Sequence, residues 1–272
     1  MDVGHRGSGF ILPGNRGFKF EQYPDGDVAI FTVCGSTRLN LVGIDTLTQC
    51  AEGIQSHAEN SELRCAILQG MSDHAFIGGA DLKEIEQLEP HNAAEFVSAI
   101  HHLCSILMKF PVPVIARIQG YCLGGGLEIA AACDFRICDS SGIFGMPEVK
   151  VGVPSVVEAA LLPRLIGRGK TRELVLRGNL INAAEAHRIG LVEQFVEDGT
   201  IDAAVAASID DVVDAAPNAI RLQKKLCQQW EDLSTAQAIE AGLSVFAQAF
   251  ETDEPRLYCQ RFFDRTKLPR SD

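Results

Sequence analysis

Residues 120–134 read GYCLGGGLEIAAACD, and this stretch constrains the fold more than any other part of the 272-residue chain. Three consecutive glycines, at positions 124–126, lead directly into an alanine-rich run that is typical of a helix. The first amides of a helix have no partner within it, so a helix that begins at such a turn can receive an oxyanion or a phosphate. The stretch lacks the GxGxxG spacing of a dinucleotide site and the GK[ST] ending of a P-loop. A tight turn that only packs the helix closely is the alternative interpretation.

Two carboxylates stand in or near this stretch. Glu128 falls in the first turn of the expected helix, where it is either a surface acid favoured by the helix dipole or an acid that faces a cleft. Glu148 follows Pro147, which restricts the local backbone. Two carboxylates on separate rigid elements suit a general acid and a general base, because burial and mutual repulsion separate their pKa values. At about 5 Å and an effective dielectric constant near 20, the repulsion is roughly 3 kcal/mol, or about two pKa units.

A second glycine-containing loop, FIGGADL at residues 76–82, follows an apolar strand expected over residues 65–69. Two glycines allow the backbone to approach a ligand and to turn the next amide outward. The alternative is an ordinary turn from strand to helix, with Asp81 as the helix cap.

Helical and extended patterns alternate along the first two hundred residues. Residues 18–22 and 28–33 predict a β-hairpin, because Pro24, Asp25 and Gly26 between them are turn formers. The pattern then predicts a helix over residues 44–57, a helix over 91–109 and a strand over 114–118, which favours an α/β core with parallel strands.

Strand patterns end after residues 190–196, and the chain from 201 to 266 reads as successive helices. Breaks are expected at Pro217, Ser234 and Pro255. We therefore expect three regions: a loose tail over residues 1–16, an α/β core over 17–200, and a helical region over 201–272.

Composition excludes several classes of protein. The net charge is −12 and no run of Lys and Arg is present, which argues against nucleic-acid binding. The nine cysteines are scattered without a CxxC pair, so we expect buried thiols in a reducing compartment and no metal site. No targeting segment is recognisable, and the apolar runs are shorter than the roughly 18 residues that a membrane span needs. The sequence predicts a cytoplasmic enzyme that does not associate with membranes.

Together these residues resemble the crotonase superfamily, also called the enoyl-CoA hydratase/isomerase superfamily. The similarity runs from about residue 18 to residue 266 and is carried by three motifs in fixed order: A-F-x-x-G-A-D-L from residue 75, G-Y-x-L-G-G-G-x-E from residue 120, and F-G-x-P-E from residue 144. The second glutamate follows the first by twenty residues. The resemblance implies an α/β fold built as a spiral of ββα units, with a C-terminal helical region that mediates oligomerisation.

The same resemblance implies an active site and a substrate. The amides of Ala80 and Gly125 would form an oxyanion hole for the thioester oxygen of an acyl-CoA, and preorganised amides of this kind contribute several kcal/mol to a transition state. Glu128 would act as the base on water and Glu148 as the acid that protonates the α-carbon. Members that shift double bonds often lack one of these glutamates, so the pair favours hydration of a 2-enoyl-CoA. No separate cofactor is implied, since coenzyme A is part of the substrate.

Binding residues are implied as well. Three short segments match those that contact coenzyme A in the family: Arg38, Leu39 and Asn40; Asp81, Leu82 and Lys83; and Phe262 with Arg265 in place of a terminal F-x-x-K. Arg265 keeps the positive charge of that motif but changes its geometry. The terminal helix of the family often closes a site across subunits, so we expect a homotrimer or a dimer of trimers.

The sequence departs from the family after Pro154. A glycine-rich stretch is usual there, whereas this chain has SVVEAALLPRL at residues 155–165. Ser155 and Glu158 fit a capping box at the start of a helix, and the alternative is that Glu158 is a third carboxylate in the cleft. His101 and His102 have no evident acid/base partner in the sequence, so we expect them to be surface or packing residues.

Two other functions remain alternatives to hydration. The first is a double-bond isomerase or another enolate-forming acyl-CoA enzyme with the same fold. The second is a non-catalytic relative that binds RNA or serves as a scaffold, which the acidic composition and the intact glutamate pair both disfavour.

Overall fold

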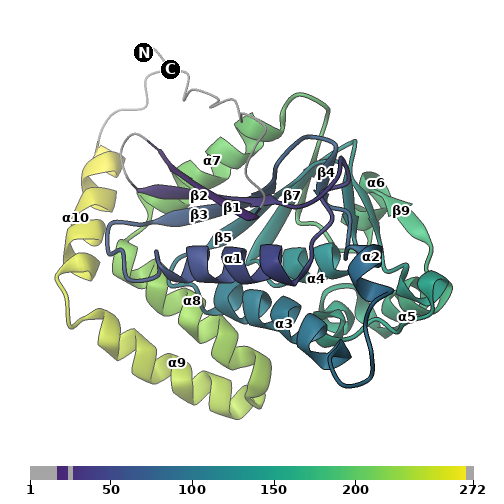
Figure 1. Ribbon diagram of the computed structural model, residues 1–272. Helices are drawn as coiled ribbons and strands as arrows, with labels where there is room; N and C mark the ends of the chain where they lie inside the picture. The colour runs from purple at the N-terminus through teal and green to yellow at the C-terminus, as the bar shows by residue number, and fades with distance from the viewer. Residues whose placement is uncertain (1–16, 24–26, 268–272) are drawn as a thin grey trace.

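Two β-sheets and a set of flanking helices make up the protein (Figure 1). The computed structural model describes residues 17–23 and 27–267, apart from the side chains of residues 265–267. The tail expected over residues 1–16 and the hairpin turn at residues 24–26 lie outside the described residues.

The larger sheet has six strands in the order β1-β2-β3-β5-β7-β10. These are β1 (Gly17–Gln22), β2 (Val28–Cys34), β3 (Cys65–Gly70), β5 (Val114–Ile118), β7 (Phe135–Asp139) and β10 (Gln194–Val196). β1 pairs antiparallel with β2, which confirms the expected hairpin. The other neighbours pair in parallel. Both faces of the central strands are apolar and buried, as parallel sheets require.

The smaller sheet has four strands in the order β4-β6-β8-β9. These are β4 (Ala75–Ile77), β6 (Tyr121–Leu123), β8 (Ile143–Gly145) and β9 (Leu180–Asn182). Three consecutive strand pairs, β3 with β4, β5 with β6 and β7 with β8, each send the first strand to the larger sheet and the second to the smaller one. Helical segments follow each pair, so the chain winds as repeated ββα units and the expected spiral fold is confirmed.

Helices cover both faces of the larger sheet (Figure 1). The helices α1 (Ile44–Gln55) and α3 (Ala93–Lys109) pack on one face, and α7 (Ile201–Asp214) packs on the other. The α7 helix buries Ile201, Val205 and Ile209. This four-residue spacing gives one apolar stripe, which explains why a helix with polar residues elsewhere remains attached to the sheet.

The remaining helical segments connect the strands or extend the C-terminus. They are α2 (Leu82–Ile85), α4 (Gly125–Ala131), η1 (Glu148–Val151), η2 (Val157–Leu161), α5 (Leu162–Arg177), α6 (Ala183–Arg188), α8 (Pro217–Asp232), α9 (Thr235–Ala249) and α10 (Glu254–Lys267). The expected breaks in the C-terminal region are confirmed, because Pro217 begins α8, Ser234 caps α9, and Pro255 stands in the first turn of α10. Among the described helices, none combines the length and the apolar character that a membrane span requires.

Candidate active site

A cavity of about 820 Å³ lies where the loops after β4 and β6 meet the start of α3 and the segment after β8. β4 and β6 are parallel neighbours, so the loops that follow them emerge at the same edge of the smaller sheet. The wall is largely apolar, and its members include Leu39, Leu82, Ile85, Phe96, Val97, Ile100, Leu123, Val151 and Val156. Charged groups are few, and among them are Glu128 and Glu148. A large apolar hollow with a few convergent polar groups is typical of a ligand site.

The Ala80 amide is directed by backbone pairing of the loop after β4. Val42 forms a parallel bridge with Ala80, in which Val42 N donates to Gly79 O at 3.0 Å and Asp81 N donates to Val42 O at 2.9 Å. Because Gly79 and Asp81, the residues on either side of Ala80, make both hydrogen bonds to Val42, the N–H of Ala80 points away from Val42. Gly79 reverses the chain with φ +114°, which a residue with a side chain rarely adopts.

The Gly125 amide is the first of α4 and has no acceptor one turn before it in the helix. The helix starts after Gly124, whose φ is +53° and whose carbonyl accepts from Leu127 N and Glu128 N. A side chain at Gly124 would collide with Glu148 Oε1, so this position needs glycine for both its conformation and its neighbour. The Ala80 and Gly125 residues thus face one cavity.

Glu128 lies in the first turn of α4, a helix in which every residue is buried. Its Oε1 accepts a hydrogen bond from Ala159 N at 3.0 Å. Its Oε2 lies 3.9 Å from where a β-carbon on Gly125 would stand, beside the candidate oxyanion amide. Burial raises the pKa of Glu128 to about 8, and although the Ala159 amide lowers it, the charges of Glu148 and Glu158 raise it further. The cleft-facing interpretation of this carboxylate is therefore the correct one.

Glu148 begins η1, directly after Pro147. Its Oε2 accepts a hydrogen bond from Ser155 Oγ at 2.8 Å, while Oε1 lies against Gly124. Burial raises the pKa of Glu148, and a hydrogen bond from its own backbone and the Ser155 hydroxyl lower it. Each glutamate is thus held through one oxygen and presents the other to the glycine turn.

The segments expected at coenzyme A have different positions. Leu39 and Leu82 line the cavity, and the exposed Arg38 and Lys83 are their sequence neighbours. Asp81 caps α2 by accepting from Lys83 N at 3.0 Å, as the alternative interpretation of this loop predicts. Its second oxygen accepts from Ser36 Oγ at 3.0 Å, so the carboxylate fastens the loop that carries the Ala80 amide.

The Asn40 side chain is committed to the protein backbone. It is fully buried, accepts from Gly35 N at 2.6 Å, and donates to Val33 O at 3.1 Å and to Phe76 O at 2.5 Å. These three bonds tie the segment after β2 to the start of the smaller sheet. A contact between this segment and a ligand therefore falls to Arg38 and Leu39.

Phe262 and Arg265 belong to α10, and Figure 1 shows α10 on the opposite side of the molecule from α2, a helix that contributes to the cavity wall. Phe262 is 64% exposed, and the Arg265 side chain lies outside the described residues. Within one chain the structure does not bring these two positions to the other candidate site residues.

The expected capping box at Ser155 and Glu158 is wrong. The short helix η2 follows Val156, whose side chain makes no cap, and Ser155 instead serves Glu148. Glu158 is 5% exposed and pairs with His101 Nδ1 through its Oε1 at 2.7 Å. His101 lies at the surface, as expected, and in addition has an acidic partner that the sequence does not reveal. These partners are 57 residues apart, and no local spacing in the sequence indicates them.

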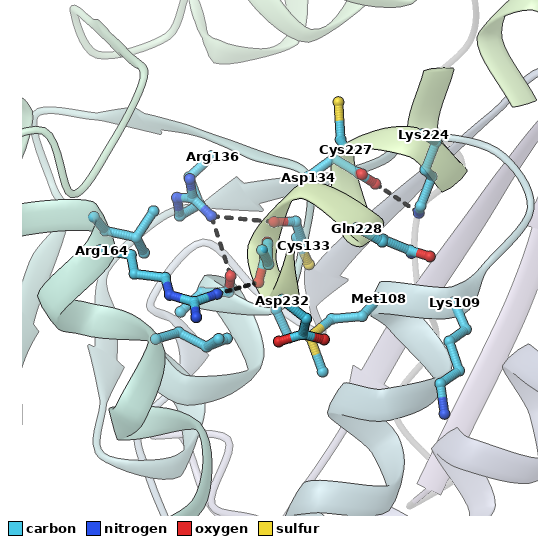
Figure 2. Close-up of a pocket in the computed structure, with 15 residues that line it drawn as sticks. Met108, Lys109, Cys133, Asp134, Arg136, Arg164, Lys224, Cys227, Gln228 and Asp232 are labelled. Carbon is cyan, nitrogen blue, oxygen red and sulfur yellow. Dashed lines mark hydrogen bonds and ion pairs between the residues drawn. The ribbon is translucent and has the colours of Figure 1, made fainter. Parts of the chain in front are cut away.

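A second, smaller cavity of about 350 Å³ lies beside α8 and the ends of α3 and α4 (Figure 2). Its buried cation Lys224 is fully engaged, since Nζ donates to Asp134 Oδ2 at 2.7 Å and to two backbone carbonyls. The Arg136 guanidinium caps the carbonyls at the end of α4, and Arg164 pairs with Glu231 at 3.2 Å. These pairings commit Lys224, Arg136 and Arg164 to protein partners, so we take the larger cavity, which holds both glutamates, as the candidate active site.

Comparison with known proteins agrees with this geometry. The family model for enoyl-CoA hydratase/isomerase matches residues 26–270. The short-chain-enoyl-CoA hydratase of Clostridium acetobutylicum is 32% identical over 247 residues, which are 90% of this chain and 94% of that protein. The crotonyl-CoA hydratase of Syntrophomonas wolfei is 30% identical over 88% of this chain and 93% of that protein. A crystal structure of enoyl-CoA hydratase from Bacillus anthracis superposes with a TM-score of 0.87 at 27% identity, covering 92% of this chain and 97% of that one. The chain therefore belongs to the enoyl-CoA hydratase/isomerase family, whose members act on acyl-CoA thioesters.

Proposed function

We propose that this protein adds water across the 2,3 double bond of an enoyl-CoA thioester. One observation carries the proposal: Glu128 and Glu148 are each held by a protein hydrogen bond through one oxygen and face the same glycine turn with the other. Hydration needs a base for the water and an acid for the α-carbon, which are the two functions that such a pair can divide. The names of the hydratases to which the chain is similar support this choice.

The amides of Ala80 and Gly125 would bind the thioester oxygen. Water adds to the β-carbon and loses a proton to one carboxylate, electrons shift onto the thioester oxygen as an enolate forms, and the α-carbon then takes a proton from the other carboxyl. Two amides fixed before the substrate arrives stabilise that developing charge without reorganising, a contribution of several kcal/mol. The reaction leaves the pair with the same total number of protons.

The pair must share one proton at the start of the reaction. The family resemblance assigns that proton to Glu148 and the base role to Glu128. Burial works against this assignment, because it raises the pKa of Glu128 to about 8. We propose that the reactive form of the pair is the one in which Glu128 is ionised and Glu148 holds the shared proton, and that the hydroxyl of Ser155 stabilises the carboxylate that Glu148 becomes after giving up that proton.

The substrate would enter with its acyl chain against the apolar wall. Leu82, Phe96 and Ile100 are among the side chains that offer such a surface. Arg38 and Lys83 are exposed cations on the two segments beside Leu39 and Leu82, and we propose that they attract the phosphates of coenzyme A. Attraction by these two cations would act against the overall charge of −12.

The direct test follows loss of crotonyl-CoA absorbance with purified wild type, Glu128→Gln and Glu148→Gln. Hydration by the wild type and its loss in both variants, with unchanged circular dichroism, is expected. Turnover of a 3-enoyl-CoA without hydration of crotonyl-CoA would replace the proposal by isomerisation.

A second measurement distinguishes the roles of the two carboxylates. Exchange of the α-protons of butyryl-CoA in D₂O needs a group that acts at the α-carbon, whereas it needs no attack by water. With the proposed roles, Glu148→Gln abolishes exchange and Glu128→Gln retains much of it. The opposite result would exchange the two roles.

We also propose that the protein forms a homotrimer or a dimer of such trimers. The helix α9 buries no residue, and Ile239, Leu243, Phe246 and Phe250 recur on it at helical spacing while more than half exposed. A contiguous apolar stripe of this kind favours burial against another subunit. Association through α9 and α10 would also carry Phe262 and Arg265 toward a partner's cavity. Sedimentation velocity of the purified chain measures the assembly size directly.

A further inference from the structure

A carboxylate and an imidazole form a pair beside the proposed base. Glu158 lies in η2 and His101 in α3, and His101 Nδ1 stands 2.7 Å from Glu158 Oε1. The side chain of Glu158 is 6% exposed, whereas that of His101 is 59% exposed. The pair thus extends from solvent into the interior beside α4.

The backbone of η2 links this pair to Glu128. The peptide that follows Glu158 carries the Ala159 amide, and this amide donates to Glu128 Oε1 at 3.0 Å. Val157, immediately before Glu158, has φ +38°, a left-handed conformation that is strained for a β-branched residue. Such strain persists only where neighbouring contacts hold the segment. The bond to His101 holds Glu158 itself, and the bond to Glu128 holds the next residue, Ala159.

Glu158 makes fewer hydrogen bonds than a buried carboxylate ordinarily does. Its Oε2 is buried and has no hydrogen-bond partner among the described residues other than the weak donor of the Cys104 thiol. Its charge also acts on its surroundings, since burial raises the pKa of the Cys104 thiol well above its usual range and the charges of Glu158 and Glu128 raise it further. Glu158 is therefore close enough to Glu128 for an electrostatic interaction, which raises the pKa of Glu128.

We propose that Glu158 and His101 form a positioning pair, which aims the Glu128 carboxylate at the cavity and holds the Glu158 carboxylate beside it. Neither residue lines the cavity, so the pair acts through Glu128 and not on the substrate. This inference rests on the proposed role of Glu128 and extends it.

Few other charged groups influence the pKa of Glu128. Glu148 from η1 and Glu158 from η2 are the charges that raise the pKa of Glu128. On α3, the Cys104 thiol stays neutral because its pKa is raised. The α5 helix also packs against η2, and its Arg164 pairs with Glu231 of α8.

The test compares Glu158→Gln and His101→Gln with His102→Gln, a matched control because His102 is the exposed neighbour of His101 on α3. Infrared difference spectra between each protein and the same protein carrying Glu128→Gln isolate the titration of the Glu128 carboxyl without substrate. The pH profile of kcat/KM for crotonyl-CoA is then measured, and circular dichroism monitors folding. His101→Gln keeps the test possible if Glu158→Gln does not fold, because His101 is largely exposed.

Both substitutions move the midpoint. Glu158→Gln removes a like charge and lowers the Glu128 midpoint by about one pH unit. His101→Gln takes away the imidazole that holds Glu158 Oε1 and moves the midpoint from its wild-type value, while His102→Gln leaves it unchanged. With Glu128 as base, the acid limb of kcat/KM moves with the midpoint. Both Glu158→Gln and His101→Gln lower kcat, and Glu158→Asp, which keeps the charge, retains the high midpoint.

An unchanged midpoint in Glu158→Gln and His101→Gln would overturn the proposal, even if turnover fell, because a purely structural role has that signature. The infrared titration does not depend on the reaction. If the wild type fails to hydrate crotonyl-CoA while the midpoints move as expected, the proposed function is wrong and the positioning pair stands.

Discussion

Replacement of Ser155 by alanine removes a side-chain hydrogen bond to the Glu148 carboxylate, in which Oγ donates to Oε2 at 2.8 Å. A hydrogen bond to a charged group is worth about 1.5–3 kcal/mol, so its loss disfavours the ionised carboxylate by about that amount and raises the pKa of Glu148. Burial already raises this pKa and the hydroxyl lowers it, so removal acts in the same direction as burial. With Glu148 as the acid, the basic limb of the pH profile moves to higher pH.

Turnover should fall as well, because the freed carboxylate loses its fixed orientation. A barrier raised by about 1.4 kcal/mol corresponds to a tenfold lower kcat. The assay is crotonyl-CoA hydration across the pH range by Ser155→Ala, with Ser155→Thr as the control that keeps a hydroxyl. A profile for Ser155→Ala that coincides with the wild type in both limbs and in kcat would refute the reasoning.

Four further outcomes are expected. Gly124→Ala places a methyl group at a residue with φ +53° and against Glu148. We expect chemical unfolding to show a loss of about 1–2 kcal/mol in stability, and hydration assays to show at least about a tenfold loss in kcat. Folding disfavours the ionised form of Glu128, whose pKa is raised to about 8, so wild-type stability falls as pH rises from about 4 to 8; Glu128→Gln escapes this and is more stable in thermal melts at pH 9, by on the order of 3 kcal/mol. Lys224→Ala removes a buried ammonium that joins the part-exposed Asp134 carboxylate to two backbone carbonyls, and it destabilises by about 1–3 kcal/mol, whereas the exposed Lys225→Ala control changes the free energy of unfolding by less than about 0.5 kcal/mol. Phe246→Asp places a charge in the apolar stripe of α9, and sedimentation velocity should report smaller species than the wild type; equal sizes would remove α9 from the interface.

The stability prediction for Glu128 bears on why this carboxylate is retained. Every residue of α4 is buried, and an apolar or amide side chain at this position would cost the fold less than a carboxylate does. The protein keeps a destabilising group beside two directed amides. Sites where a local rule is broken in this way are frequently functional.

Local pattern in the sequence was sufficient for most of the regular structure. Alternation over residues 18–22 and 28–33 predicts the hairpin, and the helical period after Gly43 predicts α1, since both patterns report which side chains face a core. Proline and serine at the breaks predict the C-terminal helices, because these residues act through their own backbone geometry. The smaller sheet could not be predicted in this way. Its strands β4, β6 and β8 have three residues each, too few for a period, and part of them reads as loop.

At the site, the sequence was enough to identify the candidate chemical groups, namely two glycine-rich loops and two glutamates in fixed order. It does not indicate that Glu128 is buried, because an acid in the first turn of a helix suits a surface and a cleft equally well. The hydrogen bonds from Ser155 to Glu148 and between Glu158 and His101 are visible only in the folded protein. A serine hydroxyl uses the same atoms to cap a helix and to bind a carboxylate. Which of the two it does depends on the groups that the fold brings within about 3 Å of it, and these groups can be distant in the sequence. Sequence spacing encodes neighbours along a helix or strand, whereas these pairings depend on how separate elements pack.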